Sequence, residues 1–203
     1  RCGMNEKHIG FAMCGSFCTF KKVIPVMKVL VDAGYEVHPI MSYNAFSTDT
    51  RFGKARDFTA EAEAICGRKI IATLTDAEPI GPKKLLDALI IEPCTGNTLA
   101  KLASGIADTP VTLAAKSHLR NARPLLIAVS TNDALAGAAK NIGALANCKN
   151  IYFVPYRQDD PVGKPTSIVA DFSKTLPALE CALEGKQIQP VINSDFGIQK
   201  PEL

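Results

Sequence analysis

Short apolar runs recur along this chain, and each is separated from the next by a segment with turn residues or helical spacing. Runs of this length, bounded by glycine, proline or small polar residues, predict strands that are buried on both faces. Strands that alternate with helices predict an open, mostly parallel, doubly wound α/β sheet. The predicted strands are 7–14, 36–41, 69–74, 88–91, 125–129 and 151–154.

The first helical segment follows the first strand. Val23, Met27 and Leu30 recur at helical spacing and predict one buried face. Pro25 lies within this pattern and predicts either a kink or a late start of the helix, because proline lacks a backbone donor. Gly34 predicts the stop.

Capping residues and stops predict the remaining helices. One helix is expected over 57–66, and another carries Leu99 and its neighbours at helical spacing. Asp133 is expected to cap the Ala-rich helix that follows it. A last helix is expected from a Ser167 cap to Glu184, with Pro177 kinking or dividing it.

Length and composition favour one domain over residues 1–203, with 186–203 as a polar C-terminal tail. The net charge of +3 is mild, and no Lys/Arg tract suggests nucleic-acid binding. We expect no membrane span and no signal peptide. The seven cysteines are odd in number and irregularly spaced, which is typical of reduced thiols in a cytoplasmic protein.

Small polar residues follow four of the predicted strands, at the point where each strand ends. Glycine lets a ligand approach the backbone, and hydroxyl and amide groups donate to phosphate or to the edges of a ring system. Each cluster alone is an ordinary turn or cap. Four clusters at the carboxyl edge of one sheet predict a ligand site. The clusters are Gly15-Ser16, Ser42, Thr95-Gly96-Asn97-Thr98 and Ser130-Thr131-Asn132.

The familiar nucleotide fingerprints are missing from the sequence. The first strand leads into GFAMCGSFCTF, which lacks G-x-G-x-x-G, and the chain contains no G-x-x-x-x-G-K-[ST]. Nicotinamide binding by the usual fingerprint and P-loop phosphate binding are therefore not supported.

The segment PCTGNTLAKLASGIAD is similar to the PASANT segment of the flavin-containing cysteine decarboxylase superfamily. The chain resembles still more the B-subunit family of dipicolinate synthases, from about His8 to Pro190. That resemblance rests on SYNAFSTDTRFG, AEPIGPK, PCTGNT, AVSTNDALAG and KNIYFVPYRQDDP, which match in order. It implies a Rossmann-like or flavodoxin-like three-layer fold of the flavoprotein family.

The resemblance also implies an FMN site. Gly15, Ser16 and Ser42 would lie near the phosphate and ribityl chain of the flavin. Ser130 would lie near the far side of the isoalloxazine ring. The residues implied to line that ring are Thr95, Gly96, Asn97 and Thr98.

The implied activity is that of one component of a two-component synthase. With a nicotinamide-dependent partner, the A-subunit of dipicolinate synthase, it would form dipicolinate from a dihydrodipicolinate-type lysine-pathway intermediate, in the cytoplasm of the mother cell during sporulation. NAD(P) would enter only through the partner, and relatives of this superfamily imply a homo-oligomer.

Two departures from the decarboxylases leave alternatives open. DAEPIGPKKLLDA lacks their histidine, and Thr131-Asn132 replaces their Met-Asn. The first alternative is a self-sufficient FMN-dependent decarboxylase or transferase. The second is a non-catalytic structural subunit.

Basic and amide side chains are candidates for a dicarboxylate substrate. Arg51, Lys83 and Asn132 are predicted to bind it, because a guanidinium fork suits a carboxylate. Asn97 and Arg51 are also the candidates for catalysis.

Cysteine and histidine residues are interpreted conservatively. For Cys14 and Cys18, a packing role is preferred to a redox pair. Their spacing is C-x-x-x-C, whereas C-x-x-C is the usual redox spacing. His8, His38 and His118 are expected at the surface, and no zinc site is expected.

Overall fold

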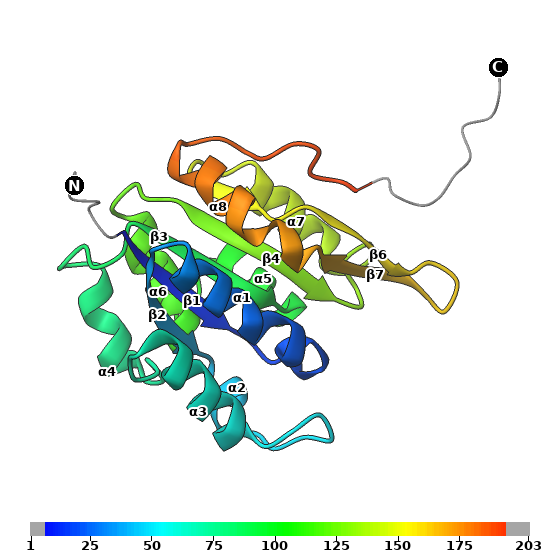
Figure 1. The fold of residues 1–203 in the computed structure, drawn as a ribbon. Helices are drawn as coiled ribbons and strands as arrows, with labels where there is room; N and C mark the ends of the chain where they lie inside the picture. The colour runs from blue at the N-terminus through cyan, green and yellow to red at the C-terminus, as the bar shows by residue number, and fades with distance from the viewer. Residues whose placement is uncertain (1–6, 194–203) are drawn as a thin grey trace.

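The computed structural model describes residues 7–193, which form a seven-stranded sheet between two layers of helices (Figure 1). The strand order is β2-β1-β3-β4-β7-β6, and β5 also pairs with β4. Strands β2, β1, β3, β4 and β5 run parallel, whereas β7 is antiparallel to both β4 and β6. The strands are β1 (His8–Met13), β2 (Glu36–Met41), β3 (Ala88–Cys94), β4 (Leu125–Thr131), β5 (Ile151–Phe153), β6 (Tyr156–Asp160) and β7 (Lys164–Ala170).

Helices cover both faces of the sheet, as Figure 1 shows with α1 and α8 in front. One core cluster joins the sheet to α1, α3 and α8, and the other joins it to α4, α5, α6 and α7. The doubly wound, three-layer flavodoxin-like fold expected from the sequence is confirmed. The helices are α1 (Phe20–Asp32), α2 (Tyr43–Ser47), α3 (Ala55–Cys66), α4 (Leu74–Ala77), α5 (Gly96–Ala103), α6 (Pro110–Leu119), α7 (Ala139–Ala146) and α8 (Thr175–Leu183), with short 3-10 turns η1 (Phe17–Thr19), η2 (Glu78–Ile80) and η3 (Phe172–Lys174).

Strand β3 is buried along its whole length. Ala88 and Ile90 face one core cluster, and Leu89 and Ile91 face the other, because successive side chains of a strand point to opposite faces. Each of the leucine and isoleucine side chains contributes roughly 1.5–3 kcal/mol when it is fully buried. This two-sided burial explains why parallel strands could be found in the sequence as continuous apolar runs.

Several predicted elements are wrong in extent. Residues 69–74 form only an isolated bridge between Ile71 and Ile40, and α4 begins within the segment. The pair Glu92–Pro93 lies inside β3 and does not end it; the pairing with β4 shifts register there. Helix α1 begins at Phe20, before Pro25, so it does not start late.

The two predicted helix caps are also wrong. The chain turns between β4 and α7, and Asp133 accepts a hydrogen bond from the Thr131 hydroxyl at 2.6 Å instead of capping that helix. Ser167 lies in β7, where β-branched neighbours favour a strand. Helix α8 starts only at Thr175. Pro177 therefore falls in its first turn, where a missing N–H leaves no helical hydrogen bond unmade.

Residues 186–193 of the predicted tail dock on the chain's own sheet. The side-chain amide of Gln187 exchanges hydrogen bonds with the backbone of Phe153, both at 2.7 Å. The Tyr156 N–H donates to the Val191 carbonyl at 2.9 Å. Residues 194–203 of that tail, and residues 1–6, lie outside the described residues. In the described part, no helix has both the length and the apolarity that a membrane span requires.

Gly10 on β1 offers a test of core packing. A Cβ at this position would lie 2.6 Å from Leu86 Cδ1 and 2.7 Å from Leu89 Cδ1, and both leucines are fully buried. We expect Gly10→Val to lower the free energy of unfolding by about 1–3 kcal/mol, because an overfilled core must shift. Urea unfolding followed by circular dichroism measures the change. Gly143→Ala is the control, since its Cβ meets nothing within 4 Å and alanine favours α7. Equal stability of Gly10→Val and the parent protein would contradict the packing argument.

Candidate functional site: a cleft at the carboxyl edge of the sheet

A cleft of about 620 Å³ opens where the parallel strands end. This volume falls within the range of roughly 300–1,000 Å³ that is typical of small-molecule sites. Its walls come from the turn after β1, the tips of β3 and β4, and the segment from β6 to η3. The polar residues that line it are Gly15, Ser16, Cys18, Thr19, Lys22, Thr95, Ser130, Thr131, Asn132, Arg157, Asp159, Lys164, Ser167, Asp171 and Ser173.

A hydroxyl pair joins the tips of two strands across the floor of the cleft. Ser16 follows β1 and Ser130 lies in β4, yet their Oγ atoms are 3.0 Å apart. Strand β3 runs between these two strands, so the contact spans the centre of the sheet. The Ser16 carbonyl accepts from the Thr19 N–H and hydroxyl at 3.0 and 2.7 Å, which fixes the turn after β1. The structure therefore brings together two of the predicted flavin-contacting serines.

Thr95 at the tip of β3 caps helix α5. Its Oγ1 accepts from the Thr98 N–H at 3.3 Å, so the threonine is an N-cap of the usual kind. Thr95 lines the cleft. The adjoining Gly96 is required by close contact, because a Cβ there would lie 2.8 Å from Asp133 Oδ1 and 2.9 Å from Thr131 Oγ1. The start of α5 is thus held tightly against the tip of β4.

Cys14 is a buried thiol beneath this capping group. The Thr98 hydroxyl donates to its sulfur at 3.2 Å. Burial raises the pKa of Cys14 to about 11, although the Thr98 hydrogen bond opposes this, so the thiol stays protonated at neutral pH. Cys18 is exposed and lines the cleft. This arrangement agrees with packing as the role of Cys14 and does not resemble a redox pair.

Other predicted flavin contacts lie beside the cleft and not in its lining. Ser42 caps α2 by accepting from the Ala45 N–H at 3.3 Å, and its own N–H donates to the Met13 carbonyl at the end of β1. Asn97 is exposed on the first turn of α5, and Thr98 is buried by its contact with Cys14.

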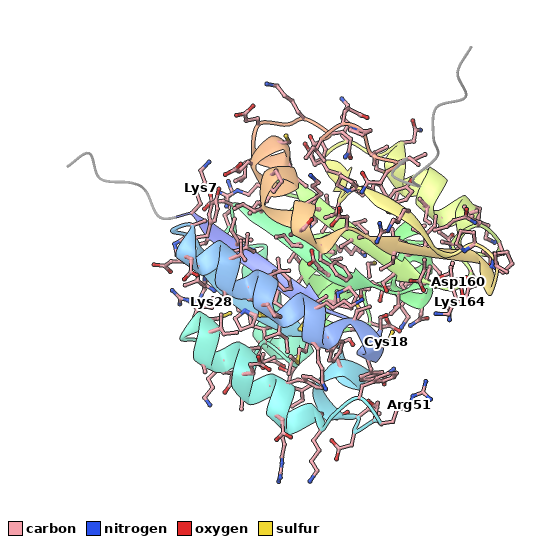
Figure 2. All side chains as sticks on the ribbon, turned by 45° about the vertical axis from the view of Figure 1, so that its right-hand side comes forward. Lys7, Cys18, Lys28, Arg51, Asp160 and Lys164 are labelled. Carbon is pink, nitrogen blue, oxygen red and sulfur yellow. The ribbon has the colours of Figure 1, made fainter. Side chains whose placement is uncertain are left out.

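The three predicted substrate residues are spread over the molecule. Asn132 lines the cleft, and its side-chain oxygen accepts from Ser167 at 3.3 Å. Arg51 lies on the loop between α2 and α3, where its guanidinium stacks over the Phe52 ring at 4.9 Å. Figure 2 shows it projecting outward on the side of the molecule that also carries Cys18. Lys83 lies exposed before β3 begins, at the amino edge of the sheet and therefore opposite the cleft.

Sequence reasoning missed the cations that line the cleft. Lys22 lies on α1, and Arg157 and Lys164 lie on the β6–β7 hairpin. Lys164 forms an ion pair with Asp159 at 3.0 Å, and Figure 2 shows it near Cys18. The turn sequence DPVG at 160–163, followed by the β-branched residues Ile168 and Val169, is a weak signal that could have indicated the hairpin. No such signal places Lys22, whose spacing in α1 fits an ordinary exposed position.

A carboxylic acid is buried in the core, on the same strand that ends at the cleft. Glu92 is fully buried on β3, and its Oε2 accepts from the Thr175 hydroxyl at 2.7 Å, whereas its Oε1 has no partner. Burial raises the pKa of Glu92 to about 8, from an ordinary value of 4.5, against the opposing effect of Thr175. The group is therefore neutral at pH 7, which avoids an unpaired charge in the core.

Glu92 should make stability fall as pH rises. Between pH 4.5 and about 8 the folded protein holds a proton that the unfolded chain releases, so the free energy of unfolding declines through this window. The half-buried His38 and the buried His118, whose pKa burial lowers to about 4, act in the opposite direction, but only below about 6.5. We therefore expect the decline between pH 6.5 and 8, by up to about 1.4 kcal/mol per pH unit.

Glu92→Gln should flatten this decline, since the amide cannot ionise. Urea unfolding at several pH values between 6.5 and 8 measures the two slopes. Glu61→Gln, on the exposed side of α3, is the control and should keep the parent slope. Identical slopes for Glu92→Gln and the parent protein would contradict a buried, protonated Glu92.

The chain was compared with known protein families, sequences and structures. The family model described as Flavoprotein matches residues 2–175. The chain is 42% identical over 193 residues to the B-subunit of dipicolinate synthase from Bacillus subtilis strain 168, and the match covers 95% of this chain and 96% of that protein. The crystal structure of the dipicolinate synthase B-subunit from Bacillus halodurans C superposes with a TM-score of 0.86 at 42% identity, covering 94% of this chain and 97% of that one. The FMN-dependent cysteine decarboxylase SpaF, with a TM-score of 0.63 and 24% identity over 88% of this chain and 95% of that one, shares the fold.

Proposed function

Because the chain belongs to the Flavoprotein family and is a homologue of the dipicolinate synthase B-subunit, we propose that it is the flavoprotein-type component of an oxidoreductase that forms dipicolinate. Its substrate would be a dihydrodipicolinate-type intermediate of the lysine pathway. It would act with the nicotinamide-dependent A-subunit of the synthase, in the mother-cell cytoplasm of a spore-forming bacterium. NAD(P) would bind to the partner, and FMN would bind in the cleft of this chain, which would assemble as a homo-oligomer.

The observation that carries the FMN proposal is the meeting of separate strand tips in one cleft. Ser16, Thr95 and Ser130 present hydroxyl groups there, and Lys22 adds a positive charge. Hydroxyls and a cation are the groups that a phosphate monoester needs, and the cleft volume suits a small-molecule cofactor. The donor set therefore fits FMN. Structural neighbours of the same fold include a decarboxylase named as FMN-dependent and a UbiX protein solved in complex with FMN.

The proposed roles follow from position in the cleft. When bound, FMN supplies hydride and single-electron transfer chemistry. Ser16 and Lys22 would hold its phosphate, and Thr95 and Ser130 would orient the ribityl chain and ring. Arg157 and Lys164 on the hairpin, together with the predicted Asn132, would bind the carboxylates of the substrate.

The remaining predicted site residues are assigned roles by their position relative to the cleft. Ser42, Gly96 and Asn97 would support the flavin from beside the cleft, and the buried Thr98 would act through Thr95, whose hydroxyl accepts from the Thr98 N–H. Arg51 and Asn97 remain the candidates for catalysis because both lie on segments that follow the carboxyl ends of strands. Lys83 does not enter the proposal, since it lies before β3 at the amino edge.

A self-sufficient decarboxylase is the second candidate, favoured by the shared fold of SpaF. Loss of carbon dioxide leaves a carbanion-like centre on the substrate, and its protonation needs a nearby acid, for which histidine is the common choice. The three histidines lie in the described part of the chain, and none of them lines the cleft. His118 is buried on α6, where its Nε2 lies 2.9 Å from the Pro124 carbonyl oxygen. The proposal of a synthase component is therefore preferred.

The FMN proposal is tested by titration. We expect the purified protein to quench the fluorescence of added FMN saturably and to give a flavin absorbance spectrum. Ser16→Ala should weaken FMN binding by about tenfold, because a hydrogen bond to a charged phosphate is lost. Ser104→Ala, on an exposed residue after α5, is the control and should bind as the parent does. A colourless protein that rejects FMN would rule out the cofactor while leaving a structural role possible.

The need for a partner makes a separate prediction. We expect the isolated chain to form little or no dipicolinate from the cyclic intermediate, with or without FMN, because it carries no nicotinamide fingerprint. Addition of the A-subunit together with a nicotinamide cofactor should restore product formation, measured by the ultraviolet absorbance of dipicolinate. Robust formation of dipicolinate by this chain alone would contradict the two-component proposal.

A further inference from the structure

Two histidines and a glutamate lie together at the amino edge of the sheet, opposite the cleft. His8 opens β1 and is the register partner of Glu36, which opens β2. His38 lies two residues after Glu36 and therefore on the same face of the strand. All three side chains are partly exposed, so an ion from solvent can reach them.

The atoms of this cluster are spaced as metal ligands are. His8 Nδ1 lies 3.0 Å from His38 Nε2 and 3.2 Å from Glu36 Oε2, and the three atoms all lie within 4.8 Å of one another. Zinc bonds of about 2.0–2.2 Å place neighbouring ligand atoms about 3–3.5 Å apart. Two of the three separations therefore already match a shared ion, and small rotations of the side chains would close the third.

We propose that His8, Glu36 and His38 bind a divalent transition-metal ion, with zinc as the probe. Two imidazole nitrogens and one carboxylate oxygen form a donor set that zinc, cobalt and nickel share. Three protein ligands leave the remaining coordination positions to water. The ion would join the starts of β1 and β2, a whole strand away from the turn at Gly15, so this site does not depend on FMN binding.

Arg68 would compete with the metal ion for Glu36. Its guanidinium contacts Glu36 Oε2, the same oxygen that faces His8. Arg68 follows α3 and its C-terminal Gly67, so it comes from an element outside the two strands. A guanidinium and a metal ion compete for one carboxylate oxygen, because both are positive. Removal of Arg68 should therefore strengthen metal binding.

The test is zinc titration by isothermal calorimetry on the full chain without a histidine tag. Cys2, Cys18 and Cys148 are replaced by serine in this background, since thiolates bind zinc and the last two are exposed. We expect one equivalent of zinc to bind. Loss of outer-shell partners already weakens metal sites by about 10–100-fold, so His38→Ala should weaken binding at least tenfold. Arg68→Ala should tighten it.

Two controls separate a metal site from a hydrogen-bonded cluster. Asp32→Asn removes a carboxylate that is paired with Lys28 elsewhere on the surface, and it should leave zinc affinity unchanged. Cobalt should give visible absorption bands that His8→Ala abolishes, which covers the case in which His38→Ala fails to fold by circular dichroism. Absence of saturable zinc binding would overturn the proposal. Weaker binding in Arg68→Ala, or unchanged binding in both histidine variants, would overturn it too.

Discussion

Strands β1, β3 and β4 run parallel at the centre of the sheet, and their carboxyl ends finish at one edge. This register is what allows Ser16 and Ser130, which are distant in sequence, to approach within 3.0 Å. It depends in turn on β3, whose side chains are buried on both faces by helices of both layers. A one-residue slip of β3 would exchange the side chains between the two cores, so the hydrophobic pattern fixes the cleft as well as the fold.

The edge of β4 is shared between two partners of opposite direction. Leu125 to Ile127 pair with the parallel β5, whereas Ser130 and Thr131 pair with the antiparallel β7. The β6–β7 hairpin therefore begins where the parallel sheet ends, and Figure 1 shows it projecting from that edge. Because the hairpin is anchored at the tip of β4, its Arg157 and Lys164 become part of the cleft wall. The positive charge of the cleft thus comes largely from an element outside the parallel core.

The parts of the fold that were predictable are those governed by local burial. Strand β2 was predicted with its observed bounds and β1 within one residue at each end, since both are short buried runs. The hairpin was missed because β6 is polar and contains no buried residue, and because the short apolar run at the end of β7 was assigned to a helix starting at Ser167. Helix α6 was missed although Thr109 and Thr112 form a capping box and Pro110 lies in the first turn. His118 was placed at the surface for the same reason, since its burial follows from the helix.

At the site, small residues after buried strands indicate a binding edge whatever the ligand, which is why Ser16, Thr95 and Ser130 were found. The identity of a charged residue does not show whether it lies at the binding edge of the sheet. Lys22 lies at that edge because it follows β1, whereas Lys83 lies at the opposite edge because it precedes β3.

The chemistry of the cleft is that of binding and orientation more than of proton transfer. Its described lining offers hydroxyls, an amide, cations, the exposed thiol of Cys18 and the carboxylates of Asp159 and Asp171. Lys164 and Ser173 engage these two carboxylates. Burial raises the pKa of Glu92 to about 8, but this group is sealed in the core, where it accepts a hydrogen bond from Thr175. A lining of this composition suits the binding of anionic ligands, and its described residues include no histidine, the usual residue for proton transfer near neutral pH. Such a site would suit the proposed two-component enzyme, in which the partner subunit would supply the nicotinamide.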